Sequence, residues 1–306
     1  MSTGFVHTTG FAPELLYPGL AEIWGLDYEQ YPIKYNKIFK VESSDKAFEK
    51  EQGMSGFTVA GEKTQGDSVG FARLTQGFQK EYVHVTYGIG AIVTREMQED
   101  DQYNVISQVP TMLAEALRRT EETLHFAVLN NGFDTSIVGA DGVCLFNTAH
   151  PNAGSGGGTQ SNRPSVAVDL TQTSLEDAYI NIENFRDENN QRISMPEKKK
   201  LVVSRSDMFN AQKILQTKYK VGSADNDVNI LANSNIELIM SNYLTDQDAW
   251  FLVNGVRNGL KSKVRREADI EKDNDRVGTQ NLAIVTTKRW TQGYTDWRDG
   301  YGSPGG

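Results

Sequence analysis

The chain has 306 residues, of which 38% are hydrophobic and 23% charged, and its formal net charge is −9. This length can form one large or two medium domains with a hydrophobic core. The acidic balance argues against specific nucleic-acid binding, because proteins that grip phosphates are usually basic. The single cysteine, Cys144, excludes an intrachain disulfide, and no apolar run approaches the ~18 residues that a membrane span needs.

The first 45 residues contain few aliphatic side chains and no clear period. Aromatic and turn-forming residues alternate there, among them Trp24, Tyr28, Tyr31 and Pro32. Such a segment has too little aliphatic surface to fold alone. We predict an arm that becomes ordered by lying across another surface, and a flexible terminus is the alternative.

Residues 54–94 have the pattern of a long β-hairpin. The first arm is expected at 54–62 and the turn at 61–68. From Val83 to Val93 apolar side chains alternate with small or polar ones, and a period of two is typical of a strand. The polar tip of the hairpin is expected to extend from the body. It consists of Glu62, Lys63, Thr64, Gln65, Gly66 and Asp67.

Apolar residues recur at intervals of three and four over residues 96–131, which predicts a long helix. Pro110 lies inside the pattern, so the regular helix either begins near Ser107 or kinks at the proline. We expect it to end at residues 130–132, where Gly132 can adopt the left-handed conformation of a C-terminal cap.

Residues 166–255 alternate between helical and strand patterns, which indicates a compact α/β lobe. The preceding stretch, 139–165, is irregular. One helix is expected to begin near Thr173, which has capping-box spacing to Glu176, and a second helix to be capped by Ser206. Short buried strands are expected at 201–203, 236–240 and 249–253.

The last part of the chain returns to a pattern of paired strands, at 260–268 and 277–287. A charged turn joins them, and it includes Lys272, Asp273, Asn274 and Asp275. The tail that follows contains four aromatic residues, separated by glycines that disfavour a helix. We expect these aromatic side chains to dock on a neighbouring surface. They are Trp290, Tyr294, Trp297 and Tyr301.

The order of these parts resembles the Hong Kong 97-type capsid fold of tailed bacteriophages. Residues 78–97 (FQKEYVHVTYGIGAIVTREM) resemble the second strand of its E-loop running into its spine helix. Residues 142–151 (GVCLFNTAHP) and 297–299 (WRD) resemble segments of the Mu-like prophage major head subunit family, and 243–253 (YLTDQDAWFLV) resemble the strand that closes the axial domain. The resemblance covers about residues 35–300, and the order and spacing of the segments carry it.

The resemblance implies an α+β fold with five parts. They are an N-arm at 1–50, an extended E-loop hairpin at 51–94, a peripheral (P) domain with a long spine helix at 95–165, an α/β axial (A) domain at 166–255, and P-domain return strands with the tail at 256–306. The implied assembly contacts are the E-loop tip and the P-domain turn, which are the polar tip and the charged turn named above.

The implied function is that of a major capsid protein, not an enzyme. Such a protein assembles through pentamers and hexamers into an icosahedral shell around the phage DNA, in the cytoplasm of the bacterial host. Its implied partners are further copies of the chain, portal and decoration proteins, and DNA without sequence-specific contact; no membrane is implied. Because no charged helical segment precedes the arm in this sequence, the resemblance implies a separate scaffolding protein as well, unless the sequence is already the mature form.

One family member cross-links its shell between an E-loop lysine and a P-domain asparagine. Lys63 and Asn274 lie in comparable parts of this sequence, but the surrounding residues do not match the motif. Two other hypotheses for a structural protein remain open. An encapsulin-like compartment would share the fold, and a phage tail or decoration protein would be a different kind of structural subunit.

The sequence shows little that points to catalysis or to a cofactor. Cys144 and His150 could form a thiol nucleophile and its base, but Cys144 is more simply a small apolar residue and His150 a loop residue. The acidic residues Glu271, Asp273 and Asp275 lack the glycine and terminal glutamate of a calcium loop. We therefore expect no catalytic residue, no cofactor and no metal.

Overall fold

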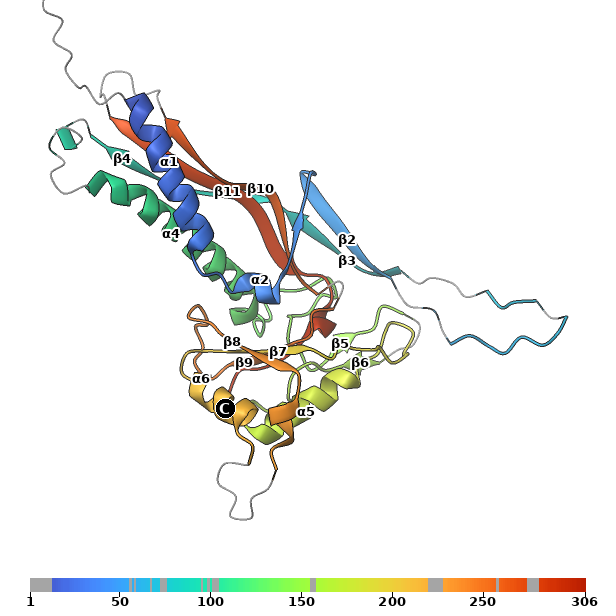
Figure 1. Cartoon of the computed structure of the whole chain (residues 1–306). Helices are drawn as coiled ribbons and strands as arrows, with labels where there is room; N and C mark the ends of the chain where they lie inside the picture. The colour runs from blue at the N-terminus through green and yellow to red at the C-terminus, as the bar shows by residue number, and fades with distance from the viewer. Residues whose placement is uncertain are drawn as a thin grey trace, which may run out of the picture. The chain divides into compact units, whose positions relative to one another are not determined.

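The computed structural model describes residues 13–54, 57, 59–66, 68–71, 76–94, 96–97, 100, 105–154, 158–219, 228–256, 259–273 and 281–306. The chain mixes helices and strands (Figure 1) and divides into two compact units. The first unit comprises Met1–Ile33, Val85–Glu122 and Arg265–Trp290, and the second Lys34–His84, Thr123–Val264 and Thr291–Gly306. Among the described residues, no helix is both long and apolar enough to cross a lipid bilayer.

The first unit is built around one hydrophobic cluster. Helix α1 (Pro13–Gln30) and helix α4 (Val105–Asn130) contribute to it, together with strands β4 (Val85–Val93), β10 (Leu260–Asp273) and β11 (Leu282–Tyr294). Burial of such side chains is the main favourable term in folding. The buried members are Leu20, Trp24, Tyr28, Val93, Ile106, Leu113, Ala114, Leu117, Ile270, Leu282 and Ile284.

Helix α1 corrects the expectation for the N-terminal arm. The sequence predicted no regular element there, yet residues 13–30 are helical. The expectation that the arm is ordered by another surface is confirmed, because the apolar stripe of α1 packs against side chains of α4, β10 and β11. Leu20, Trp24 and Tyr28 follow one another at intervals of four, which places them on one face of a helix. Aromatic residues replace the aliphatic ones that usually mark such a stripe, and Trp24 and Tyr28 stack with ring centres 5.0 Å apart.

A buried carboxylate ties α1 to its neighbours in the first unit. Glu121 of α4 is fully buried and accepts a hydrogen bond from the Tyr28 hydroxyl. The Arg118 guanidinium lies 3.1 Å from Glu121, and the Lys288 ammonium of β11 lies 3.2 Å from it. Since a buried charge is tolerated only when it is paired and hydrogen-bonded, these contacts make the position of α1 specific.

The strand with period-two alternation is confirmed, but its partner differs from the expected one. Strand β4 pairs antiparallel with β11, from Val85 opposite Trp290 to Val93 opposite Leu282. The four-stranded sheet has the order β1-β10-β11-β4, and β1 (Lys40–Ser43) pairs parallel to β10. The predicted return arm therefore belongs largely to this sheet and not to the hairpin.

The hairpin itself is formed by β2 (Phe48–Met54) and β3 (Gln76–Val83), with Phe48 opposite Val83. The predicted first arm, 54–62, was wrong, because its described residues beyond Met54 lie in the loop. Strand β2 has the sequence FEKEQGM, with charges on both faces and no apolar alternation. One face of β2 is exposed, and the other turns the half-buried Glu49 and Glu51 toward polar partners, so no apolar alternation marks the strand.

Helix α4 confirms the predicted long helix, and it continues through Pro110 to end at Asn130 as expected. The expectation of a left-handed Gly132 was wrong, because its φ is not in the positive range. Glycine is required for a different reason. A Cβ at Gly132 would lie 2.6 Å from Cδ2 of Phe146 and 2.9 Å from the carbonyl oxygen of Leu129.

The predicted α/β lobe contains a second four-stranded sheet, in the order β12-β9-β7-β8. All three predicted strands are present, and the tail adds the fourth, β12, antiparallel to β9. The elements of the second unit not yet bounded are α2 (Tyr35–Ile38), β5 (His150–Pro151), β6 (Thr159–Gln160), α5 (Gln172–Glu183), β7 (Lys199–Val203), α6 (Met208–Gln216), η1 (Ile230–Asn233), β8 (Ile236–Met240), β9 (Trp250–Val253), η2 (Trp297–Asp299) and β12 (Gly300–Ser303).

Both predicted helix caps in this lobe were wrong. Thr171, not Thr173, caps α5, and it forms a reciprocal capping box with Ser174. The sequence Thr-Gln-Thr-Ser offers overlapping cap patterns, and spacing alone does not separate them. Helix α6 begins after Asp207, whose side chain makes no cap hydrogen bond, and the Ser206 hydroxyl bonds to Gln247 instead.

The tail aromatics do not dock on a neighbouring surface. Trp290, Tyr294, Trp297 and Tyr301 are all buried within the chain. Trp297 stacks on His150 with ring centres 4.2 Å apart. The carboxylate of Asp299, in the same WRD segment, accepts hydrogen bonds from the backbone of Val256 (2.7 Å) and Leu260 (2.6 Å). Burial raises the pKa of Asp299 to about 6, although these hydrogen bonds act in the opposite direction.

The close approach at Gly132 yields a test of the helix end. We expect Gly132→Ala to lower the free energy of unfolding by about 1–3 kcal/mol, because the new methyl group overpacks the site. Gly25→Ala in α1 is the matched control, since a Cβ there meets no atom within 4 Å, and it should be neutral or slightly stabilising. Equal denaturation midpoints for Gly132→Ala and the wild type would contradict the steric argument.

Candidate assembly surfaces

An ionic cluster holds the base of the hairpin in the second unit. The ammonium groups of Lys261 and Lys263, both on β10, are almost fully buried. Glu51 of β2 lies 2.8 Å from Lys261 and 2.6 Å from Lys263. Glu42 of β1 lies 3.4 Å from Lys263. Two carboxylates thus compensate two buried ammonium groups, and β2 supplies one of them.

A hydrogen-bonded chain joins the second strand of the hairpin to the same cluster. The Thr295 hydroxyl donates to Glu51 at 3.0 Å. A threonine hydroxyl has one proton, so in its 2.7 Å contact with Tyr82 of β3 the tyrosine hydroxyl is the donor. Burial raises the pKa of Tyr82 well above its ordinary value, so it keeps this proton. Both hairpin strands are therefore fixed where they leave the cluster.

The charges in the cluster stabilise one another. Burial alone would raise the pKa of Glu51, but hydrogen bonds and attraction from Lys261 and Lys263 outweigh it and hold the pKa below its ordinary value. The same balance lowers the pKa of Glu42. Burial alone would lower the pKa of Lys263, and Glu51 and Glu42 raise it instead. The folded protein therefore favours the ionised form of all three groups.

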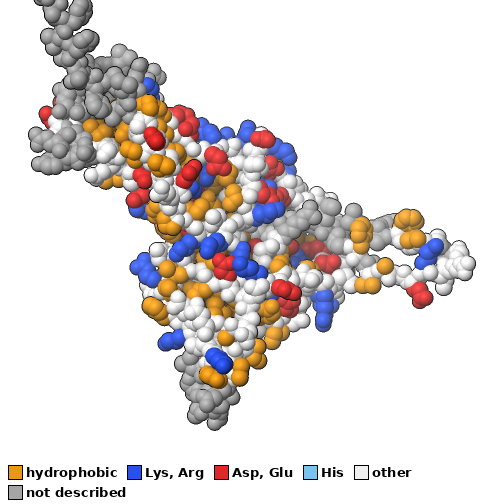
Figure 2. All heavy atoms as spheres, viewed as in Figure 1, with side chains coloured by type: hydrophobic (Ala, Val, Ile, Leu, Met, Phe, Trp, Pro, Cys, Tyr) orange, Lys and Arg blue, Asp and Glu red, His pale blue; other side chains and the backbone are white. Residues whose placement is uncertain are grey.

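The loop between β2 and β3 is exposed at every residue that the structure describes, 57, 59–66 and 68–71. The predicted tip residues Glu62, Lys63, Thr64, Gln65 and Gly66 lie here, whereas Asp67 is outside the described residues. Four apolar side chains flank this tip, as the space-filling view shows along the loop (Figure 2). They are Phe57 (61% exposed), Val59 (82%), Val69 (61%) and Phe71 (97%).

Sequence reasoning missed these four side chains and concentrated on the polar tip. A signal was available, because Phe57 and Val59 alternate on one side of the tip and Val69 and Phe71 on the other. A large apolar side chain left in water forgoes about 1.5–3 kcal/mol of burial. Several of them on one exposed segment mark a surface that another molecule covers.

The predicted P-domain turn is only partly described. Lys272 and Asp273 are the last residues of β10, and the Lys272 ammonium lies 5.6 Å from the ring centre of Tyr17. Asn274 and Asp275 lie outside the described residues, so a cross-link between Lys63 and Asn274 stays a prediction. Within the described parts of the chain, no group of three or more His, Cys, Asp or Glu residues is arranged to hold a metal ion.

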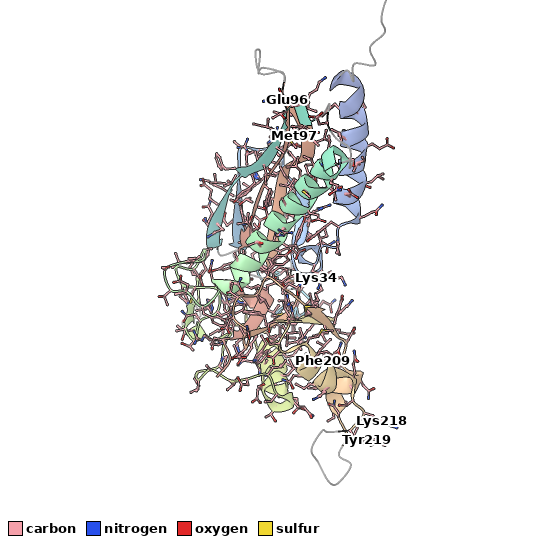
Figure 3. All side chains as sticks on the ribbon, turned by 90° about the vertical axis from the view of Figure 1, so that its left-hand side faces the viewer. Lys34, Glu96, Met97, Phe209, Lys218 and Tyr219 are labelled. Carbon is pink, nitrogen blue, oxygen red and sulfur yellow. The ribbon has the colours of Figure 1, made fainter. Side chains whose placement is uncertain are left out.

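A second apolar surface lies on the α/β lobe. Phe209 of α6 is 69% exposed, while Ala211 and Leu215 of the same helix are buried. Figure 3 shows Phe209 on α6 and Tyr219 in the segment that follows it. Ile230, which is 76% exposed, begins η1, an element that packs against α6. These side chains form a second candidate contact surface.

The one candidate catalytic pair is engaged in internal contacts. Cys144 is buried, and its thiol donates to the carbonyl oxygen of Phe146 at 3.3 Å. His150 lies in β5 and not in an irregular loop, and it is buried, with Nδ1 2.6 Å from Asp141 and Nε2 3.0 Å from Asn162. Neither group is exposed to a substrate, and both stabilise the packing of the segment.

The hairpin, the long helix, the α/β lobe and the returning strands together form the Hong Kong 97-type capsid fold. A virus-like particle from Pyrococcus furiosus matches over 94% of this chain and 99% of its own, at 10% identity and a TM-score of 0.57. The capsid of cyanophage P-SCSP1u matches over 89% of this chain and 87% of its own, at 12% identity and a TM-score of 0.59. A structure of Mycobacterium phage Patience matches over 97% of this chain and 89% of its own, at 14% identity and a TM-score of 0.56.

The family described as "Phage capsid protein" matches residues 78–301, which is more than half of the chain. The protein therefore belongs to the phage capsid protein family, and it is a structural protein of the virion capsid, not an enzyme. The finer resemblance to the Mu-like prophage head subunits stays a prediction. A search of the curated proteins finds no match.

The ionic cluster predicts that one carboxylate fixes the hairpin. In Glu51→Gln, Lys261 and Lys263 lose a buried partner, which costs about 3 kcal/mol. Hydrogen-exchange protection of the β3 amides should then fall about 100-fold. Glu81→Gln is the control, because Glu81 pairs with Lys50 where both side chains are about half exposed, so its loss should change little. Equal protection in the two variants would refute the anchor.

The same cluster predicts an acid-sensitive hairpin. Folding lowers the pKa of Glu42 and Glu51 from the ordinary 4.5, so their stabilisation is complete above that pH and is lost as pH falls through the lowered values. Protection factors of the β3 amides should drop below pH 4.5 in the wild type. The drop should be smaller in Glu51→Gln, and a drop of the same size in both proteins would contradict the assignment to Glu51.

Proposed function

We propose that the chain is the major capsid protein of a tailed phage and assembles through pentamers and hexamers into an icosahedral shell around DNA. The observation that carries this proposal is the exposed loop with Phe57, Val59, Val69 and Phe71 around a polar tip. The ionic cluster fixes the two strands that lead into this loop. A segment that is fixed at its base and carries exposed apolar side chains on both sides of its tip is suited to cover a second copy of the chain.

Ring closure explains how such contacts build a shell. A head-to-tail contact, in which the loop of one copy meets a different surface of the next, generates closed rings. The apolar surface with Phe209 and Ile230 on the α/β lobe supports a further contact within such a ring. Each contact is weak alone, but once one has formed the others become intramolecular, and the combined affinity rises steeply.

The remaining partners follow from the same function. The net charge of −9 favours a wall that encloses DNA without sequence-specific contact. A separate scaffolding protein, a portal, and decoration proteins would complete the particle, which would assemble in the host cytoplasm. An encapsulin-like compartment differs in its contents, so the nucleic acid or protein found inside purified particles separates the two readings.

The tip of the loop provides the test of this proposal. Deleting residues 62–68 should leave a folded chain with unchanged thermal unfolding, because the described residues of this segment are exposed, but it should abolish shells in negative-stain electron microscopy. Replacing the same seven residues with glycine and serine is the matched control, since it keeps the length of the loop. Normal shells from the deletion variant would contradict the proposed role of the hairpin.

A further inference from the structure

Four lysines of the second unit gather around helix α2 and strands β7 and β8. Lys34 and Lys37 belong to α2 and the residue before it, and Lys198 and Lys200 to β7 and the residue before it. In the space-filling view, Lys and Arg side chains surround an acidic group at the level of α2 and β8 (Figure 2). We call these four residues the lysine patch.

Strand β7 gives the patch two of its members. Successive side chains of a strand point to opposite faces, so the run from Lys198 to Lys200 is divided between them. The side chain of Lys199 is fully buried, and its ammonium lies 2.6 Å from Glu183. Lys198 and Lys200 therefore share the other face, about 7 Å apart along an extended chain.

The segment around α2 supplies the other two lysines. The Lys34 ammonium donates to the carbonyl oxygen of Met240 at 2.7 Å, at the end of the edge strand β8. The Lys200 ammonium donates to the carbonyl oxygen of Lys37. Bonds to uncharged carbonyl groups fix two of the four ammonium groups in place but do not neutralise their charge.

The patch carries more positive than negative charge. Glu237 of β8 lies 3.3 Å from Lys37 and 2.8 Å from Lys198. Hydrogen bonds and attraction from Lys198 and Lys37 hold the pKa of Glu237 below its ordinary value, so it is ionised and offsets one charge. Even if Glu197, the exposed residue before Lys198, offsets a second charge, the four lysines remain in excess. This surface is thus an exception in a chain whose net charge is −9.

The surface of the patch favours a polyanion over another protein surface. Every residue of α2, β7 and β8 is described, and none is an exposed large apolar side chain. A protein interface has an apolar core, and stacking on bases requires aromatic side chains. The side chains of Lys37 and Lys198 are 56% and 57% exposed. An exposed lysine ammonium is a point charge that binds a phosphate without reading sequence.

We infer that the lysine patch binds phosphate groups of the packaged DNA. This inference rests on the proposed function, in which the shell encloses DNA, and it names the surface of each copy that the DNA touches. Phosphates follow one another at ~3.4 Å along the axis of each DNA strand, so several lie within reach of one patch. Each contact is weak, and repetition over many copies makes the combined contact strong.

Binding of a short labelled DNA duplex of random sequence to the full-length unassembled chain tests the inference. At ~50 mM salt, the double variant Lys37→Gln with Lys198→Gln should bind at least about tenfold more weakly than the wild type in fluorescence anisotropy. Its plot of log affinity against log salt should be shallower by about 1.8, since each lost phosphate contact removes about 0.9. Thermal unfolding should not change, because exposed ion pairs contribute little to stability.

The matched control removes two lysines at the hairpin. Lys46 and Lys50 pair with Glu49 and Glu81 at 3.5 and 3.2 Å, and their side chains are 74% and 50% exposed. Lys46→Gln with Lys50→Gln changes the net charge by the same amount, yet it should bind DNA almost as the wild type does. Equal losses in the two double variants, or no loss in the first, overturn the inference.

A carboxylate variant gives a measurement in the opposite direction. Glu237→Gln removes the negative charge from the patch, so its affinity for the duplex should rise. Glu81→Gln is the control, because Glu81 also pairs with an exposed lysine but lies on the hairpin, and its affinity should stay near that of the wild type. Unchanged or weaker binding by Glu237→Gln contradicts the inference.

Shell assembly without DNA separates this inference from the proposed function. The double variant Lys37→Gln with Lys198→Gln retains the apolar assembly surfaces, so it should form normal empty shells in negative-stain electron microscopy. Loss of these shells would identify an acidic surface of a second copy as the partner and overturn the inference. Normal shells with unchanged DNA binding overturn it as well and leave the proposed function intact, whereas absence of shells from the unmodified chain refutes the proposed function itself.

Discussion

The second unit depends on the pairing of two buried ammonium groups with carboxylates. Lys261 and Lys263 lie almost fully buried on β10, where an uncompensated charge would cost several kcal/mol. Glu51 can satisfy them only if β2 lies beside β10, and Thr295 extends the same network to Tyr82 on β3. The polar cluster thus sets the direction in which the hairpin begins, which hydrophobic packing alone does not specify.

Elsewhere in the described parts of the chain, most large apolar side chains and buried charges are covered or paired within their own unit. In the first unit, aromatic stacking and the paired Glu121 hold α1 in place. In the second, the tail aromatics and the WRD segment are buried. Exposed apolar side chains lie on the hairpin loop, on β4 and on the α/β lobe, and single ones lie on α1 and α4. Surfaces left exposed by an otherwise well-packed chain are those that a partner covers.

Sequence reasoning succeeded where burial on one face imposes a period. The spacing of α4 is such a case. Strand β4 was found from its alternation although most of its side chains are exposed, and the order of the parts indicated the fold family. Sequence reasoning failed where an element has no aliphatic pattern that reports its buried face. The half-buried face of β2 carries Glu49 and Glu51 in place of apolar residues, so the strand shows no apolar alternation, and α1 marks its stripe with aromatic residues.

The assembly surface was only half predictable for a related reason. The polar tip of the hairpin was identified from its turn residues, but the apolar side chains beside it were not, because a single chain does not show which exposed groups a second copy will cover. The ionic cluster was hidden as well. Its members, from Glu42 to Thr295, are far apart in sequence, and only the fold brings them together.

Hydrogen exchange of the loop in two states of the protein tests the central claim most directly. Residues 59–66 and 68–71 are exposed in the single chain, so their amides should exchange at nearly the intrinsic rate in the unassembled protein. In assembled particles the same amides should be protected about 100-fold or more, because a second copy then shields them from water. Equal exchange in free and assembled protein would show that the hairpin does not join one copy to the next.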